Sequence, residues 1–176
     1  MMVVAGLGLG GVLNVARAEN SAGLAAEADK AVAAAASAVE EARAAIKNGK
    51  QFVAMIPADS PLMGEVAEIL KAAKENWILA VSALEGAKES ASKISSASSP
   101  EIAQDYKLLA TVNAGVALSG AKVVQTGILF VDAAANNKSE SLDIIRTAMQ
   151  DSLAAAAQVQ FNYDRVKGLI AEKYSK

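Results

Sequence analysis

The feature that most constrains the fold of this chain is a seven-residue spacing of apolar residues, repeated in four long stretches. Apolar residues that recur at steps of three and four lie on one face of an α-helix. The spacing is strictest from Ile102 to Ala134, where a second apolar column runs beside it from Ala110 to Ala135. Two adjacent columns predict that this segment contacts more neighbours than the other three.

Three short breaks separate the four stretches, and each contains residues typical of a helix boundary. In the first break, Ser60 is expected to cap a helix whose first residue is Pro61. Ser99 and Pro100 repeat this arrangement at the second break, and the third break contains two asparagines at residues 136–137. We therefore expect helices at residues 21–51, 61–96, 100–136 and 140–174.

Helices of this length, joined by such short breaks, must run antiparallel to their neighbours along the chain. At 1.5 Å per residue, each would be about 45–55 Å long. The predicted fold is therefore all-α, an up-down-up-down antiparallel four-helix bundle with long, heptad-patterned, alanine-rich helices of the coiled-coil type. The alternative is two helical hairpins that pair only in an oligomer.

The composition supports a helical core and excludes several classes of function. The chain is 53% hydrophobic, and alanine, the best helix former, makes up between a fifth and a quarter of it. A net charge of −2 without a Lys/Arg cluster argues against a nucleic-acid partner. The chain has no Cys and no His, so it lacks disulfides, thiolate ligands, the commonest transition-metal ligand and the usual general base. We expect no catalytic residue, no metal, no cofactor and no enzymatic activity.

The N-terminal segment has features of an export signal. Residues 1–15 are mostly apolar, and they lead to Ala16 and Ala18, the small residues that signal peptidase accepts before its cleavage site. We expect a signal peptide at residues 1–18 and an exported bundle domain at residues 19–176, periplasmic or extracellular. Because the segment lacks a positively charged start, the alternative is an apolar first helix or strand of the domain.

Folding the chain about its breaks places small residues at one level of the bundle. Trp77 should lie level with Gly120, with the alanines at residues 154–157, and with those of residues 33–38. The simplest interpretation is size complementarity, in which one indole fills the space beside small residues. The alternative is an apolar pocket between helices, lined by Trp77, Gly120, Val124 and Ala155.

These patterns favour a non-enzymatic structural or protein-interaction bundle that assembles at the cell envelope, with itself or another envelope protein as its partner. A first alternative is a carrier of a lipid-like or other apolar small molecule in the bundle core. A second is a membrane-inserting, pore-forming protein, because residues 108–131 are mostly apolar, carry Lys122 as their single charge and approach the length of a membrane span.

Overall fold

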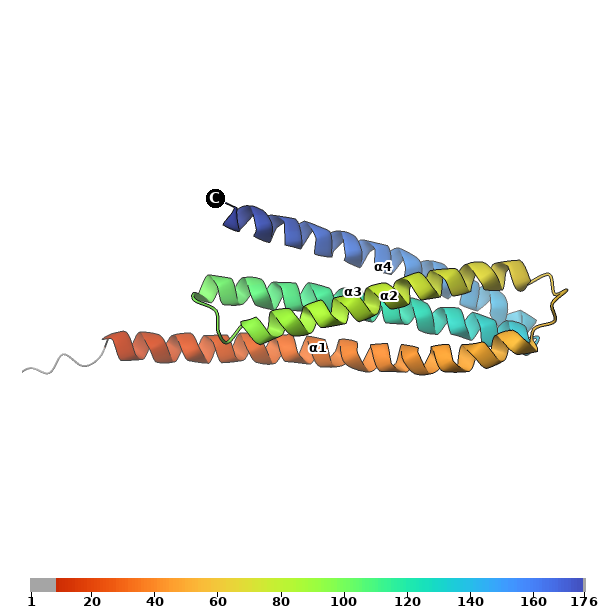
Figure 1. Cartoon of the computed structure of the whole chain (residues 1–176), viewed down its shortest axis with the longest axis horizontal. Helices are drawn as coiled ribbons and strands as arrows, with labels where there is room; N and C mark the ends of the chain where they lie inside the picture. The colour runs from red at the N-terminus through yellow and green to blue at the C-terminus, as the bar shows by residue number, and fades with distance from the viewer. Residues whose placement is uncertain (1–8, 176) are drawn as a thin grey trace, which may run out of the picture.

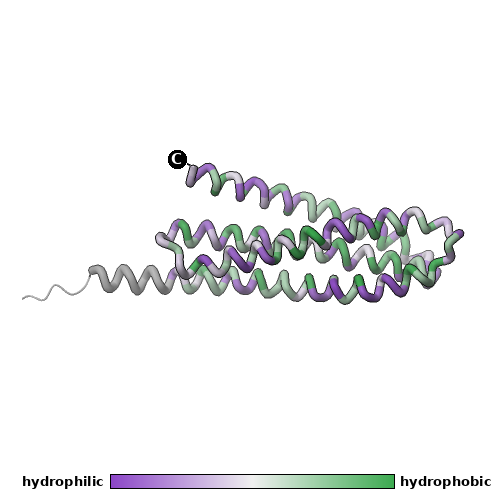
Figure 2. The backbone as a smooth tube through the Cα atoms, in the orientation of Figure 1, coloured by the Kyte–Doolittle hydropathy of each residue, from purple (hydrophilic) through white to green (hydrophobic). Residues whose placement is uncertain are grey.

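The protein consists of four long helices that run alternately up and down, as the computed structural model shows (Figure 1). The structure describes residues 9–175, with side chains from residue 20 onward. The helices are α1 (Leu9–Met55), α2 (Met63–Lys93), α3 (Pro100–Ala135) and α4 (Ser139–Tyr174). Hydrophobic residues recur along each of them between hydrophilic ones (Figure 2). The predicted all-α architecture of four antiparallel helices is confirmed.

Helix α3 is the centre of the molecule, because it packs against each of the other three helices. Seventeen of its residues are buried, whereas α4 has three buried residues, Leu142, Met149 and Ser152. The backbone of α4 lies next to α3 and, within residues 9–175, next to neither α1 nor α2. Helix α3 therefore contacts more neighbours than the other three helices, as its two apolar columns predict.

By length and composition α3 could also cross a membrane, but 67% of its most apolar window is buried inside the bundle. A helix that packs on three neighbours is expected to be apolar on most of its surface. The central position of α3 in the bundle, where most of this window is buried, therefore explains why the helix is so apolar.

The helix boundaries follow the predicted breaks, with three corrections, one of which is that α2 ends at Lys93, three residues before its expected end. Helix α3 begins as expected: Pro100 is in its first turn, and Ser99 Oγ accepts a hydrogen bond from the Ile102 amide at 3.2 Å. Helix α2 instead begins at Met63, two residues later than predicted, because Ser60 Oγ accepts from the Leu62 amide and closes a turn before the helix. Helix α1 continues to Met55, four residues beyond the expected end.

The turn between α3 and α4 is closed by hydrogen bonds to the last carbonyls of α3. The Lys138 amide donates to the Ala133 carbonyl at 2.9 Å, and the Asn137 amide donates to the Ala134 carbonyl at 3.4 Å. Asn137 has a φ of 52°, the left-handed conformation that this helix ending requires and that Asn tolerates. The chain can therefore reverse within a few residues.

The register of the bundle is fixed where small residues meet. A Cβ atom on Gly120 would lie 2.8 Å from the Asn76 carbonyl oxygen, so α2 and α3 approach closely one residue from Trp77, at the predicted level. A Cβ on Gly49 would lie 2.6 Å from Ile128 Cδ1, and Glu27 pairs with Lys107, so α1 runs parallel to α3.

The core differs between the two ends of the bundle. At the end that holds the α1–α2 and α3–α4 connections, all four helices contribute large side chains, including Phe52, Val66, Phe130 and Met149. At the other end, the core cluster consists of α1 and α3 residues such as Ala28, Ala103 and Ala110, together with Ile94, which directly follows α2. Figure 1 shows that α4 diverges from the other helices towards this second end. We call the first the closed end and the second the open end.

The predicted signal peptide at residues 1–18 coincides with the start of α1. Residues 1–8 lie outside the described residues, and residues 9–19 are described by their backbone alone. Export therefore stays a prediction from the sequence.

Candidate functional site

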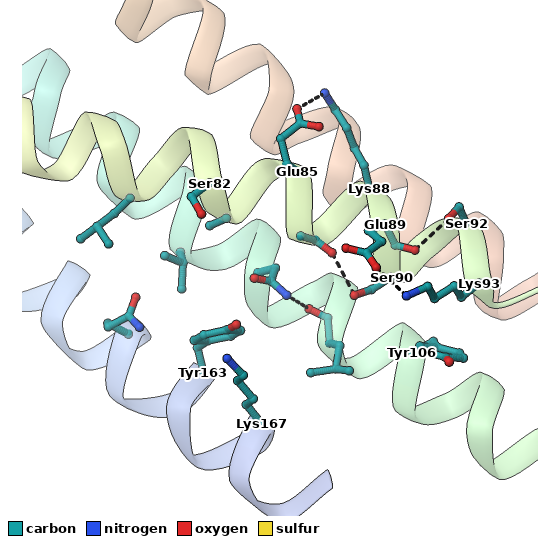
Figure 3. A pocket seen from close by; sticks show the side chains of 17 residues that line it. Ser82, Glu85, Lys88, Glu89, Ser90, Ser92, Lys93, Tyr106, Tyr163 and Lys167 are labelled. Carbon is teal, nitrogen blue, oxygen red and sulfur yellow. Dashed lines mark hydrogen bonds and ion pairs between the residues drawn. The ribbon is translucent and has the colours of Figure 1, made fainter. Parts of the chain in front are cut away.

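The divergence of α4 leaves a groove between α2 and α4 above the central helix (Figure 3). Its larger part has a volume of about 890 Å³, with Leu109, Asn113 and Val116 of α3 between the two walls. A smaller depression of about 240 Å³ shares Val116 with it and reaches Gly120. We call the two together the α2–α4 groove. Along α2 it extends from Asn76 to Lys93, roughly 26 Å at the rise of a helix.

A row of small residues runs along the α2 wall of this groove. Ser82, Gly86 and Ser90 recur every fourth residue, and Ser90 Oγ donates a hydrogen bond to the Gly86 carbonyl at 2.9 Å. A Cβ on Gly86 would lie 3.0 Å from Asn113 Oδ1, so α2 lies directly against α3 here. Asn113 is buried and donates to the Leu109 carbonyl at 2.9 Å. Such a wall leaves room for a second helix to approach α2 closely.

The rim of the same wall carries charges of both signs. Glu85 pairs with Lys88 at 2.9 Å and Glu89 pairs with Lys93 at 2.5 Å, all on the exposed surface. The hydrogen bond from Lys93 lowers the pKa of Glu89, and the same bond raises the pKa of Lys93. Exposed pairs of this kind add little stability. The alternation of positive and negative charges along this rim instead determines which partner surface can pair with it.

Polar contacts hold α4 at both ends of the groove. At the closed end, Arg146 donates two hydrogen bonds to the Glu65 carboxylate of α2, at 2.6 and 2.8 Å. At the open end, Lys173 Nζ and Tyr174 OH lie 2.7 and 2.6 Å from Asp105 Oδ2 of α3. The groove therefore lies between two anchored ends of α4.

These contacts shift the pKa values of both carboxyl groups. Burial raises the pKa of Asp105, but the hydrogen bonds from Lys173 and Tyr174 and the charge of Lys173 together outweigh it, so the net pKa is lowered. The hydrogen bond from Arg146 lowers the pKa of Glu65. Both carboxylates are therefore favoured in their charged form.

A second depression lies between α1 and α2, and we call it the α1–α2 cleft. Its volume is about 440 Å³. Apolar side chains from three helices line it: Ile46, Val53, Leu70, Ala73, Trp77 and Ile128. All of them except Val53 belong to the largest apolar cluster or pack against it, so the cleft is an uncovered indentation of the core. The tight contact between Gly49 and Ile128 brings α1 against α3 beside it.

Two lysines, Lys50 of α1 and Lys74 of α2, also line this cleft and are exposed. In the region with described side chains, residues 20–175, no carboxylate pairs with either ammonium group. The charges among the lining residues are both positive. The cleft thus combines an apolar interior with a cationic edge.

The four residues predicted to line an apolar pocket are separated in the structure. Trp77 and Val124 meet in the largest apolar cluster, where Val124 is fully buried and Trp77 is half-buried and lines the α1–α2 cleft. Gly120 lies in the α2–α4 groove together with Ala156 and Ala157, the predicted level of α4. Ala155 is exposed. One pair of the predicted set is therefore brought together, and the other two residues lie elsewhere.

The sequence interpretation did not single out Lys50, Lys74 or the α2–α4 groove. A usable signal for the lysines was present, because Lys50 directly follows Gly49 and Lys74 directly follows Ala73, and both of these preceding residues belong to the seven-residue spacing of their helices. That position is the edge of a helix interface, where long charged side chains lie beside apolar surface. The groove has no comparable signal, because the heptads of α4 continue unchanged past it.

No protein-family model matches this chain, and neither a curated protein nor a solved structure shows detectable similarity to it. Over the side chains of residues 20–175, no group of three acidic residues lies close enough together to hold a metal ion. The groove and the cleft are the features from which a function can be argued.

Proposed function

We propose that this chain is a non-enzymatic, exported helical protein that assembles with a second copy of itself through the α2–α4 groove. The observation that carries the proposal is the position of α4, whose backbone lies next to α3 and away from α2. This arrangement leaves one face of α2 uncovered, where Leu79 is 47% exposed; Ile78 and Val81 of the same helix are also exposed. Exposed apolar surface rimmed by polar residues is typical of an interaction site.

A two-fold axis allows each copy to fill the groove of the other. If α2 of the second copy lies between α2 and α4, the same axis places α2 of the first copy between α2 and α4 of the second. The four helices then form one layer, in which the two α2 helices lie side by side and an α4 lies at each edge. Such an isologous contact is the commonest way in which identical chains form a dimer.

The charges and small residues of α2 favour a second copy as the occupant. An antiparallel crossing centred between Gly86 and Ala87 would bring the groove-lining small residues Ser82, Gly86 and Ser90 of the two copies together, while Ala87 stays buried in the core of its own chain. The same crossing places Glu85 opposite Lys88 of the second copy, so that the two ends of the contact carry complementary charges. A net charge of −2 leaves little overall repulsion between copies.

The proposed location is periplasmic or extracellular, which the small residues Ala16 and Ala18 after an apolar run support. Insertion of α3 into a membrane would require it to leave the helices that bury most of its apolar window. Assembly between copies needs no such rearrangement, and it therefore has the stronger support. Another envelope protein with a similar α2-like helix could occupy the same groove.

Paired charge reversals test this assembly, because they can both break and restore it. The Glu85→Lys chain has only positive charges at the two crossing positions, and the Lys88→Glu chain has only negative ones. Each alone should dimerise more weakly than the original chain in analytical ultracentrifugation, measured over a wide range of concentration. An equal mixture should form a heterodimer in native mass spectrometry, because the opposite charges then face each other.

The matched control is Glu40→Lys, which removes an exposed pair with Arg43 at the same three-residue spacing on α1. Its self-association should equal that of the original chain. Leu79→Glu should abolish the dimer while leaving the helical circular dichroism unchanged. An original chain that stays monomeric at every concentration would contradict the proposal, as would a mixture that restores nothing. Binding to anionic vesicles by the original chain would favour the membrane alternative.

A further inference from the structure

We infer that the α1–α2 cleft is a binding site for a single-chain anionic amphiphile, an acyl carboxylate whose chain lies on the apolar floor and whose head group meets Lys50 and Lys74. This site shares no lining residue with the α2–α4 groove, so it stands apart from the proposed assembly. The argument rests on the shape, polarity and charge of the cleft.

The shape and polarity of the cleft fit an alkyl chain. Its volume of about 440 Å³ is within the usual range for small-molecule sites. The lining extends from Ile46 to Val53 along α1 and from Leu70 to Trp77 along α2, roughly 10 Å in each helix. Ile46, Val53, Leu70 and Trp77 are each half-buried, so an apolar chain seated there would cover surface that the fold leaves in contact with water.

The edge of the cleft specifies the charge of the ligand. Lys50 and Lys74 come from different helices and line the same depression. Within residues 20–175, neither has a hydrogen bond or an ion pair with a protein group, so both ammonium groups can bind a ligand without displacing a carboxylate. An anionic head group between them would gain two charge-assisted contacts.

A single alkyl chain fits better than a bilayer surface. The cleft is an indentation between two helices, and a bilayer would contact its rim more readily than its floor, where Ala73 and Ile128 are buried. A monomeric amphiphile can enter lengthwise between α1 and α2. The free acid and the anionic phospholipid share an alkyl chain and a negative head group, and separate titrations distinguish them.

Trp77 provides the readout, because it is the single tryptophan of the chain and it lines the cleft. We expect decanoate, kept below its micelle concentration, to change Trp77 fluorescence saturably in the full chain. Burial of each further methylene should raise the affinity about fourfold, so decanoate should bind about 16-fold more tightly than octanoate. Decanol should bind more weakly, and decyltrimethylammonium should bind least because of the lysines.

Matched lysine variants separate the cleft from general positive charge. Lys50→Gln combined with Lys74→Gln should weaken decanoate binding by about tenfold and leave decanol binding unchanged. The control is Lys47→Gln combined with Lys71→Gln, which makes the same charge change one turn earlier on each helix, outside the cleft lining. That control should bind decanoate as the original chain does. Val53→Phe should fill the cleft and weaken both ligands.

Three outcomes would overturn the inference. The first is the absence of a saturable Trp77 response to decanoate; if the chain then sediments with vesicles of phosphatidylcholine and phosphatidylglycerol, a membrane surface is the ligand instead. The second is an equal response to decanoate and decyltrimethylammonium. The third is an equal loss of decanoate binding in the two lysine double variants. Circular dichroism shows whether Val53→Phe folds, and the lysine variants test the site independently of it.

Discussion

The closed and open ends of this bundle are built from similar heptads but have different cores. At the closed end, Phe130 is fully buried and Met149 is 4% exposed, and α4 completes a four-helix core. At the open end, small residues such as Ala28 and Ala103 let three helices pack without help from α4. Large side chains require a fourth helix to exclude water, whereas a three-helix alanine core is already closed. The difference leaves α4 with one half that packs into the core through Leu142, Met149 and Ser152, and one half that borders a groove.

The largest expected effect tests whether residues of one apolar column of α4 contribute differently to the free energy of unfolding at the two ends of the bundle. Met149→Ala removes a buried side chain and should lower the free energy of unfolding by about 2–5 kcal/mol. Ile170→Ala, in the same column of the same helix, is half-buried at the open end and should cost less than about 1 kcal/mol. Urea denaturation followed by circular dichroism measures both. Equal losses would show that α4 packs alike along its whole length.

The sequence predicts which face of α4 turns inward, but not how closely it packs. Leu142 and Met149 are buried, while Val159, Tyr163 and Ile170 continue the same spacing and are only half-buried. A heptad column depends on the residues of one helix, whereas packing distance depends on what the neighbouring helices already cover. The alanines at residues 110, 114, 117 and 121 of α3 are already buried in cores formed with α1 and α2. The position of α4 is therefore a property of the whole bundle.

Local signals were most reliable where one residue type has one physical role. Ser99 and Pro100 predicted the start of α3, while Ser60 and Pro61 misplaced the start of α2 by two residues, since Ser60 closes a turn instead. The level of Gly120 was also predictable, because the chain reverses about a short break. The cleft was not, because it is lined by residues of α1, α2 and α3 together, and the pattern of one helix does not encode how three helices meet.

Two glycine substitutions test the same comparison between the two ends, and their effects on stability should be of intermediate size. Gly120→Ala should lower the free energy of unfolding by about 1–3 kcal/mol, because the new Cβ would lie 2.8 Å from the backbone carbonyl of Asn76. Gly168→Ala, on the outer part of α4, should raise it by about 0.5–1 kcal/mol, because nothing lies within 4 Å and alanine favours a helix. Thermal unfolding would record opposite signs. Loss of stability at Gly168 would mean that this half of α4 is packed more tightly than the structure shows.

The smallest effect concerns the polar contacts at either end of α4 and appears as a pH dependence. The pKa values of Glu65 and Asp105 are lowered below their ordinary values of 4.5 and 3.8. Their stabilising contribution is therefore complete above those values and is lost as the pH falls through the lower pKa of the folded state. Glu65→Gln should reduce the acid sensitivity of the global unfolding transition, because Glu65 joins α4 to α2 beside the four-helix core. Asp105→Asn should instead leave the global transition nearly unchanged and speed amide exchange in the last turns of α4, where Lys173 and Tyr174 lose their partner. Asp105→Asn could instead shift global unfolding as much as Glu65→Gln does. That result would place the open end in the same cooperative unit as the closed end. The groove would then be a rigid feature of the folded chain, and not the edge of a helix that opens separately.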